Sequence, residues 1–240
     1  MKIMIIGASR GLGRALFEGL AEPGNTMIGV SRSLPRDLKL PRGAYQQWIC
    51  ADFSSPRTAV QHIEAESPDT LDTLICNIGI WEKTAFSDSY AFLQQTDDET
   101  ISLVDVNITS ILLLLKRLIP KLLSSNSAKP QILLTGSTSG LRQSGRPEMA
   151  FGASKTALNG IADALRENFR EEQLAVTSLQ LGYLNTDDDL SVPRDTAAHN
   201  GNGELIPVHD VVNLVKTLLT LSEASFVREL VLPAIKDPRF

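Results

Sequence analysis

The feature that most constrains this chain is a regular alternation of short apolar runs with segments whose apolar residues recur at helical spacing. The first pair is a strand at residues 3–6 and a helix whose apolar residues, from Leu12 to Leu20, share one face. Strands that are apolar throughout are buried on both faces, as in a parallel sheet covered by helices. The sequence therefore predicts a doubly wound, Rossmann-type α/β fold with about seven parallel strands and helices on both faces. The other strands are expected at 26–30, 45–50, 73–76, 131–134, 174–181 and 228–232, and the other helices at 54–66, 97–123, 147–171 and 208–221.

All 240 residues are expected to form one domain, because no internal repeat or low-complexity linker interrupts the alternation. Two longer polar stretches, at about 80–95 and 185–203, each follow a strand. Open parallel sheets bind ligands at the carboxyl ends of their strands, so these stretches are the expected substrate loops. The aspartates at 187–189 could bind a cation, but a solvated lid is the favoured interpretation.

Composition excludes several classes of function. A net charge of -5 lacks the basic excess of a nucleic-acid-binding protein. The longest apolar run, residues 111–115, is too short to span a bilayer, and the first residues lack the pattern of a secretory signal. We therefore expect a cytoplasmic protein with neither a nucleic-acid nor a membrane partner. Cys50 and Cys76 are isolated in apolar runs and are expected to be buried free thiols. No metal site is expected, since the spacing of the three histidines fits surface or capping positions better: His62, His199 and His209.

A glycine-rich segment, GASRGLG at residues 7–13, joins the first strand to the first helix. Glycines allow a tight turn and close approach of the backbone to a pyrophosphate, and the helix N-terminus then offers free amides and a partial positive charge. An ordinary glycine-rich turn is the alternative, but the strand before it and the helix after it are the context that a dinucleotide site requires. The cofactor-binding residues expected in this loop are Gly7, Ser9, Arg10, Gly11, Leu12 and Gly13.

The spacing of these glycines resembles that of the short-chain dehydrogenase/reductase family, and the resemblance spans essentially the whole chain. Asn77 and Gly79 match two positions of the family's Asn-Asn-Ala-Gly motif, although Cys76 and Ile78 depart from it. Residues 181–186 match its Pro-Gly-x-x-x-Thr segment, with leucine in place of the proline. The resemblance implies further cofactor contacts at Asp52, Phe53, Asn77, Gly79, Lys155, Gly182, Leu184 and Thr186.

The end of the second strand bears on the choice of cofactor. An NAD site places an acid there to accept from the ribose 2′-hydroxyl, whereas this chain has Ser31 and Arg32. Together with Arg10, Arg32 offers guanidinium groups that suit a 2′-phosphate. The alternative is that both arginines are solvated surface charges. We predict NADP(H) as the cofactor.

The resemblance also implies a catalytic set made of Asn107, Ser137, Lys155 and a tyrosine four residues before the lysine. The spacing puts both side chains on one helix face, where the lysine lowers the tyrosine's pKa and the phenol exchanges a proton with the substrate oxygen. In this chain the segment reads FGASK, so Phe151 stands at the tyrosine position. Glu148, seven residues before the lysine, does not supply the tyrosine of the enoyl-reductase branch either.

Three explanations of Phe151 remain open. The chain is an engineered Tyr-to-Phe variant, or a natural oxidoreductase that takes its proton from water, Ser137 or another residue, or a protein that has lost redox chemistry. Our leading prediction is an NADP(H)-dependent oxidoreductase that moves hydride between nicotinamide and a small carbonyl or alcohol substrate. The alternative is a silent NADP(H)-binding sensor or interaction protein, or a non-redox catalyst. Tyr183 follows the sixth strand, where it either reaches the active site or serves packing.

The helix at 97–123 carries more apolar residues than one stripe against a sheet requires. The helix at 147–171 adds alanines that permit close helix approach. In the resembled family these two helices pair with their copies across a two-fold axis. We therefore expect a homodimer, or a tetramer built from it, unless the 80–95 loop covers the surplus apolar surface within the chain.

Overall fold

Seven parallel strands form the central sheet of the computed structural model, which describes residues 1–240. The strand order is β3-β2-β1-β4-β5-β6-β9, and every neighbouring pair is parallel. The chain leaves β1 toward β2 on one side and returns to β4 on the other, which places the switch point between β1 and β4. The predicted doubly wound fold is confirmed. The strands are β1 (Lys2–Ile6), β2 (Thr26–Ser31), β3 (Tyr45–Cys50), β4 (Thr73–Cys76), β5 (Gln131–Thr135), β6 (Ala175–Leu181) and β9 (Glu229–Leu232).

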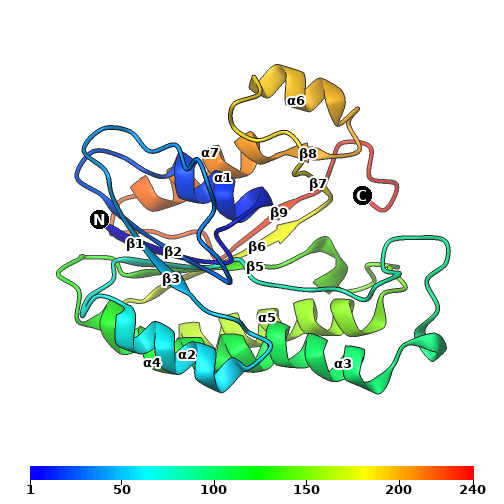
Figure 1. The fold of residues 1–240 in the computed structure, drawn as a ribbon, viewed down its shortest axis with the longest axis horizontal. Helices are drawn as coiled ribbons and strands as arrows, with labels where there is room; N and C mark the ends of the chain where they lie inside the picture. Colours follow the sequence, from blue (N-terminus) through cyan, green and yellow to red (C-terminus); the bar gives the residue numbers. More distant parts are fainter.

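Helices cover both faces of the sheet (Figure 1). One face carries α1 (Gly11–Gly19) and α7 (Val208–Thr220), and the other carries α2 (Pro56–Glu66), α4 (Ser110–Leu123) and α5 (Met149–Asn168). Each layer encloses its own apolar cluster, which explains why β1, β4, β5 and β6 are buried along almost their whole length. Edge strands β3 and β9 contact only one neighbour and are largely exposed.

The predicted helix at 97–123 contains a break in its hydrogen-bond pattern. It consists of α3 (Asp97–Val104), a π-helical turn at Asp105–Thr109, and α4. The Ser110 hydroxyl donates to the Asp105 carbonyl at 2.8 Å and supports the wider turn. Single π turns inside α-helices often lie at functional sites. Here the turn contains the buried Asn107.

The 185–203 segment is more regular than its sequence predicts. Strand β7 (Leu184–Asn185) pairs with β8 (Ile206–Pro207), and α6 (Arg194–Asn200) lies between them. The Asn185 side-chain amide donates to the Asp188 carboxylate at 2.7 Å and to the Ala197 carbonyl at 3.0 Å. These bonds hold β7 and α6 together within the 185–203 segment. Elements of two to seven residues are too short to show a period, which is why the sequence pattern missed them. The 80–95 segment is irregular as expected, apart from a 3₁₀ turn at Phe92–Gln94.

One expectation about a single residue is wrong. Cys50 is exposed, because β3 is an edge strand with one open face, whereas Cys76 on the central β4 is buried as expected. Burial raises the pKa of the Cys76 thiol to about 12. His209 is half-buried at the start of α7, and its two ring nitrogens are enclosed without a partner, so it makes no capping hydrogen bond. None of the helices is long and apolar enough to cross a membrane.

Candidate functional site

The loop between β1 and α1 has room only for glycine at its key positions. Gly7 and Gly11 have φ values of +85° and +51°, in the left-handed region that favours glycine. A Cβ atom on Gly13 would lie 1.9 Å from the Gly7 carbonyl oxygen. The Gly7 amide donates to Val30 at 2.8 Å, and the Asn77 side chain donates to the Gly7 carbonyl at 3.4 Å. These contacts tie the loop to the ends of β2 and β4.

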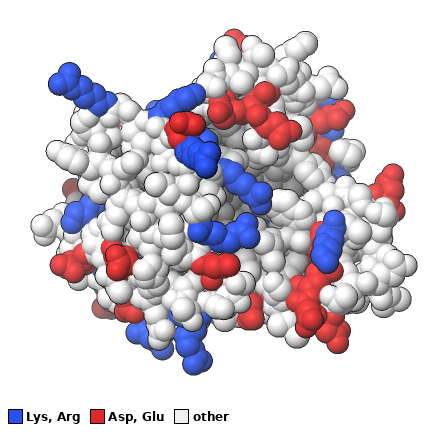
Figure 2. Space-filling view, in the orientation of Figure 1, with Lys and Arg blue, Asp and Glu red and all other residues white.

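The N-terminus of α1 opens onto the same place. The side chain of Arg10, at the N-cap, makes no capping bond, and the first turn holds no acid, so its positive end is not neutralised by the chain. Ser31 is buried and its hydroxyl donates to the Ser33 carbonyl at 2.7 Å, while Arg10 and Arg32 are exposed. Figure 2 shows basic side chains gathered beside a hollow on this face. The arrangement favours an anionic ligand.

Segments that follow β3 and β6 complete the rim of this cradle. Asp52 is exposed and accepts from the Ser54 amide at 3.0 Å, whereas Phe53 is buried. A Cβ atom on Gly11 would lie 3.3 Å from the Thr186 methyl carbon, so the segment after β6 returns to the glycine loop. The Gly182 amide donates to the Leu232 carbonyl at 2.8 Å, and the half-buried Leu184 begins β7.

Lys155 and Asn107 meet where β4 ends. A Cβ atom on Gly79 would lie 3.2 Å from the Lys155 ammonium and 3.7 Å from the Asn107 Oδ1. Asn107 accepts from the Ile80 amide and donates to the Ile80 carbonyl, both at 2.8 Å, so its side chain holds the start of the 80–95 loop. Lys155 is buried and donates to the Thr135 carbonyl at 3.0 Å. Desolvation lowers the pKa of this ammonium from 10.5 to about 8.

Ser137 follows β5 and begins a 3₁₀ turn at Thr138–Gly140. Its hydroxyl accepts from the Ser139 amide at 3.1 Å. A Cβ atom on Gly140 would lie 2.7 Å from the Lys155 carbonyl carbon, and the Thr156 hydroxyl donates to the Gly140 carbonyl at 3.2 Å. The segment that carries Ser137 is therefore packed onto α5 beside Lys155.

Phe151 belongs to a cluster of aromatic rings next to the lysine. Its ring centroid lies 5.6 Å from the Lys155 ammonium nitrogen. Phe86 packs edge-on against Phe151 at 5.3 Å and against Tyr183 at 5.7 Å, and Trp81 lies 6.4 Å from Phe151. Phe151 is buried, but Trp81, Phe86 and Tyr183 are partly exposed. The cluster forms an apolar wall that joins the 80–95 loop to α5 and to the end of β6.

Two buried carboxylates that the sequence analysis did not predict as site residues fasten this wall. Glu82 accepts from the Ala150 amide at 2.9 Å and from the Phe151 amide at 3.1 Å, at the start of α5. Glu148 accepts from the Phe86 amide at 3.0 Å. Both residues are less than 5% exposed, Glu82 at 1% and Glu148 at 4%. The free amides at the N-terminus of α5 stabilise the Glu82 carboxylate. The sequence carries no sign of this contact, because Glu82 and Ala150 are 68 residues apart in the chain.

A second unpredicted group surrounds Tyr183. The Arg146 guanidinium donates to the Tyr183 hydroxyl at 2.7 Å and to the Asp237 carboxylate at 2.7 Å. It also lies 4.6 Å from the centroid of the Tyr183 ring. Burial raises the pKa of this phenol, and the Arg146 charge opposes that rise. The salt bridge is almost enclosed, with Arg146 and Asp237 side chains 9% and 1% exposed.

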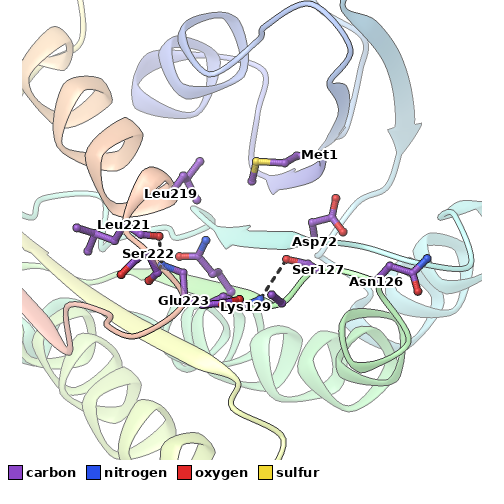
Figure 3. A pocket seen from close by; sticks show the side chains of 11 residues that line it. Met1, Asp72, Asn126, Ser127, Lys129, Leu219, Leu221, Ser222 and Glu223 are labelled. Carbon is purple, nitrogen blue, oxygen red and sulfur yellow. Dashed lines mark hydrogen bonds between the residues drawn. The ribbon is translucent and has the colours of Figure 1, made fainter.

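One cavity lies at the other edge of the sheet (Figure 3). It measures about 690 Å³ and is lined by residues that precede the strands, including Met1 before β1 and Asp72 before β4. Its lysine, Lys129, donates to the carbonyls of Leu221 and Ser222 and is occupied in joining two loops. The glycine cradle and the lysine–asparagine pair lie instead at the carboxyl edge, which is the candidate site.

Comparison with known proteins agrees with this geometry. Residues 1–196 match the family model described as short chain dehydrogenase. An NADPH-dependent pterin aldehyde reductase of Arabidopsis thaliana is 28% identical over 199 residues, which cover 77% of this chain and 75% of the relative. A 3-oxoacyl-(acyl-carrier-protein) reductase of Escherichia coli is 24% identical over 93% of this chain and 91% of its own.

Solved structures share the fold. The Pseudomonas aeruginosa RhlG/NADP complex superposes with a TM-score of 0.77 at 21% identity, covering 98% of this chain and 95% of its own. An alcohol dehydrogenase of the archaeon Thermococcus sibiricus, complexed with 5-hydroxy-NADP, has a TM-score of 0.79 at 18% identity, covering 98% and 96%. At these identities the likeness establishes the architecture alone.

Proposed function

This chain belongs to the short chain dehydrogenase family, and on that basis we propose that it is an NADP(H)-dependent oxidoreductase acting on a small carbonyl or alcohol. The observation that carries the proposal is the meeting of a glycine cradle, an open helix N-terminus and a buried lysine at the switch point of a parallel sheet. Curated relatives that match this chain include reductases, and one of them is named as NADPH-dependent.

The residues present fit a nicotinamide dinucleotide. A pyrophosphate needs backbone amides at close range, and Gly7, Gly11 and Gly13 provide a cradle that any side chain would fill. Lys155 is a buried cation whose hydrogen bond is to a neutral carbonyl, so a polar ligand that accepts from it would offset part of the cost of its burial. Gly79 leaves the space beside its ammonium open.

The preference for NADP(H) over NAD(H) rests on charge. At the end of β2 the chain has Ser31 and an exposed Arg32, and Arg10 projects from the glycine loop. Guanidinium groups bind a 2′-phosphate through charge-assisted hydrogen bonds. None of these positions holds an acidic residue, which would repel the phosphate. Solved relatives have been captured both with NADP and with NADH, so the family alone does not decide the cofactor.

A bound nicotinamide supplies or accepts the hydride, and the chain's own residues arrange the rest. Lys155 would hold the ribose side of the cofactor, Asn107 would keep the lysine and the 80–95 loop in place, and Ser137 would donate to the substrate oxygen. Phe151 stands where the family's phenol is expected and has no proton to give. The aromatic wall around it suits a substrate with an apolar or aromatic body.

Cofactor preference is tested by calorimetric titration of NADPH and NADH. We expect NADPH to bind more tightly, and Arg32→Ala to weaken NADPH by about tenfold or more while leaving NADH unchanged, because one charge-assisted contact is lost. Arg170→Ala, an exposed arginine at the opposite edge paired with Glu167, is the matched control. Equal affinity for the two nucleotides would reject NADP(H) preference.

Turnover is tested by NADPH oxidation with a panel of aldehydes and ketones and by NADP⁺ reduction with alcohols, for the wild type and Phe151→Tyr. We expect both forms to oxidise NADPH and the variant to be at least as fast as the wild type, since it gains a phenol beside Lys155 that can act as a general acid. If both forms bind NADPH but neither turns over any substrate, the protein is a cofactor-binding sensor or non-redox catalyst and the oxidoreductase proposal fails.

A further inference from the structure

The proposed reaction needs a proton donor, and Phe151 has no proton to give. The chain has three tyrosines, and they lie in very different places. Tyr45 is exposed on edge strand β3. The Tyr90 hydroxyl accepts from the Met149 amide at 2.8 Å, in the 80–95 loop, where no cation is bonded to it. Tyr183 stands at the carboxyl end of β6, directly after Gly182.

Tyr183 is connected to Lys155 through two intervening rings, those of Phe86 and Phe151. Its ring lies 5.7 Å from Phe86, which lies 5.3 Å from Phe151, whose ring is 5.6 Å from the Lys155 ammonium. The residue is 37% exposed, so part of it is in contact with water. A group that must give up a proton in each turnover and recover it from solvent needs that access.

The surroundings of Tyr183 keep the phenol protonated in the resting protein, because burial raises its pKa, and they place one cation beside its oxygen. Arg146 donates to the phenol oxygen at 2.7 Å, which leaves the phenol's own O–H bond free to donate. The same guanidinium would stabilise the phenolate that remains, and Asp237 holds it in place at 2.7 Å. The charged groups that face the phenol are Arg146, Glu148, Asp237 and Arg239.

We propose that Tyr183 is the proton donor of this protein, with Arg146 as its charge partner, so that the phenol has moved from α5 to the end of β6. The inference rests on the proposed function. In the reduction, the carbonyl carbon takes the hydride supplied by NADPH, and the electron pair of the C=O π bond moves to oxygen. The O–H bond of Tyr183 breaks, its proton bonds to that oxygen, and the Tyr183 phenolate regains a proton from water. The reverse sequence oxidises an alcohol with NADP⁺.

The first test uses kinetics of substitutions, with a carbonyl that the wild type reduces. Tyr183→Phe should lower kcat by about a hundredfold or more, with the NADPH dissociation constant unchanged by calorimetry. The double variant Phe151→Tyr/Tyr183→Phe should recover turnover, because a phenol is restored beside Lys155. A structural defect at residue 183 would not be rescued in this way. Tyr45→Phe is the matched control and should leave kcat unchanged.

The second test needs no turnover. Ionised tyrosine absorbs in the near ultraviolet, so the difference between wild-type and Tyr183→Phe titrations follows the Tyr183 phenol alone. Saturating NADP⁺ should lower the pKa of this phenol by about one unit, because the oxidised nicotinamide ring adds a positive charge near it. The same titration of Tyr45→Phe against wild type should show no shift with NADP⁺.

The outcomes separate the two proposals. If the wild type turns over and Tyr183→Phe turns over equally well, or if only Tyr90→Phe loses activity, Tyr183 is not the donor although the oxidoreductase assignment stands. An unchanged Tyr183 titration with NADP⁺ bound also overturns the inference, since the phenol is then remote from the nicotinamide. If no form oxidises NADPH, the proposed function fails and the donor assignment fails with it.

Discussion

The burial of Lys155 predicts an unusual dependence of stability on pH. Desolvation lowers the pKa of this ammonium from 10.5 to about 8, and the side chain is held only by the Thr135 carbonyl. Each tenfold change in proton affinity corresponds to about 1.4 kcal/mol. Keeping the charged lysine inside the fold therefore costs roughly 3 kcal/mol of the free energy of unfolding at neutral pH, a large fraction of a typical domain's stability.

The sign follows from comparing the folded and unfolded states. Below about pH 8 both states carry the proton, and the cost of burying the charge is felt in full. As the pH rises from about 8 toward 10.5, the folded state is already neutral while the unfolded chain still binds the proton. The cost therefore declines, and this residue makes the fold more stable as the pH increases, opposite to the usual behaviour of an ion-paired lysine.

Urea unfolding of the wild type and Lys155→Met at pH 7 and pH 9.5 measures the effect. Methionine keeps an unbranched apolar side chain but has no group that titrates. The stability of the wild type relative to this variant should rise by about 2 kcal/mol between the two pH values, the part of the total cost that those pH values span. Lys216→Met, at an exposed position on α7, should show no such trend. A constant difference between wild type and Lys155→Met would refute the desolvation argument.

Three further expectations concern other parts of the chain. Gly13→Ala should abolish NADPH binding by calorimetry and lower the free energy of unfolding by about 1–3 kcal/mol, since its Cβ would overlap the Gly7 carbonyl; normal binding would exclude this packing account. A thiol reagent at pH 8 should modify only Cys50 in the native protein, because Cys76 is buried and burial raises its pKa to about 12; two rapidly reacting thiols would contradict this. We propose a homodimer through α3–α4 and α5, where apolar side chains such as Leu112 stay exposed; light scattering that gives a single mass near 26.1 kDa would refute it.

Local chemistry in the sequence was sufficient to predict the sheet and its glycine-rich loop. The strands of the inner sheet are continuous apolar runs, so the chain has no way to place them except inside. The glycines at 7, 11 and 13 are required by the turn itself, since two of them take positive φ and the third touches backbone. Such requirements act within a few residues, and a sequence pattern records them directly.

Exposure at the sheet edge was less predictable. Tyr45–Cys50 is a strand, as the pattern indicates, but the sequence does not say that it is an edge strand and that Cys50 faces outward. The π turn that contains Asn107 could not be predicted from the sequence either. One widened turn leaves the helical spacing of apolar residues on either side almost unchanged. Both features follow from which neighbours each element acquires in the folded molecule.

The residues that shape the substrate side were decided by tertiary structure. Glu82 caps α5 from 68 residues away, and Arg146 binds Tyr183 at a separation of 37 residues and Asp237 at a separation of 91 residues. A buried charge is tolerated only when its partner arrives at hydrogen-bond distance, and that partner comes from another loop at the same sheet edge. The sequence by itself determined the fold and the glycine loop where we propose that the cofactor binds, because each depends on neighbouring residues. Only the folded chain decided which side chains meet beside Lys155, because their contacts depend on loops that the sheet brings together.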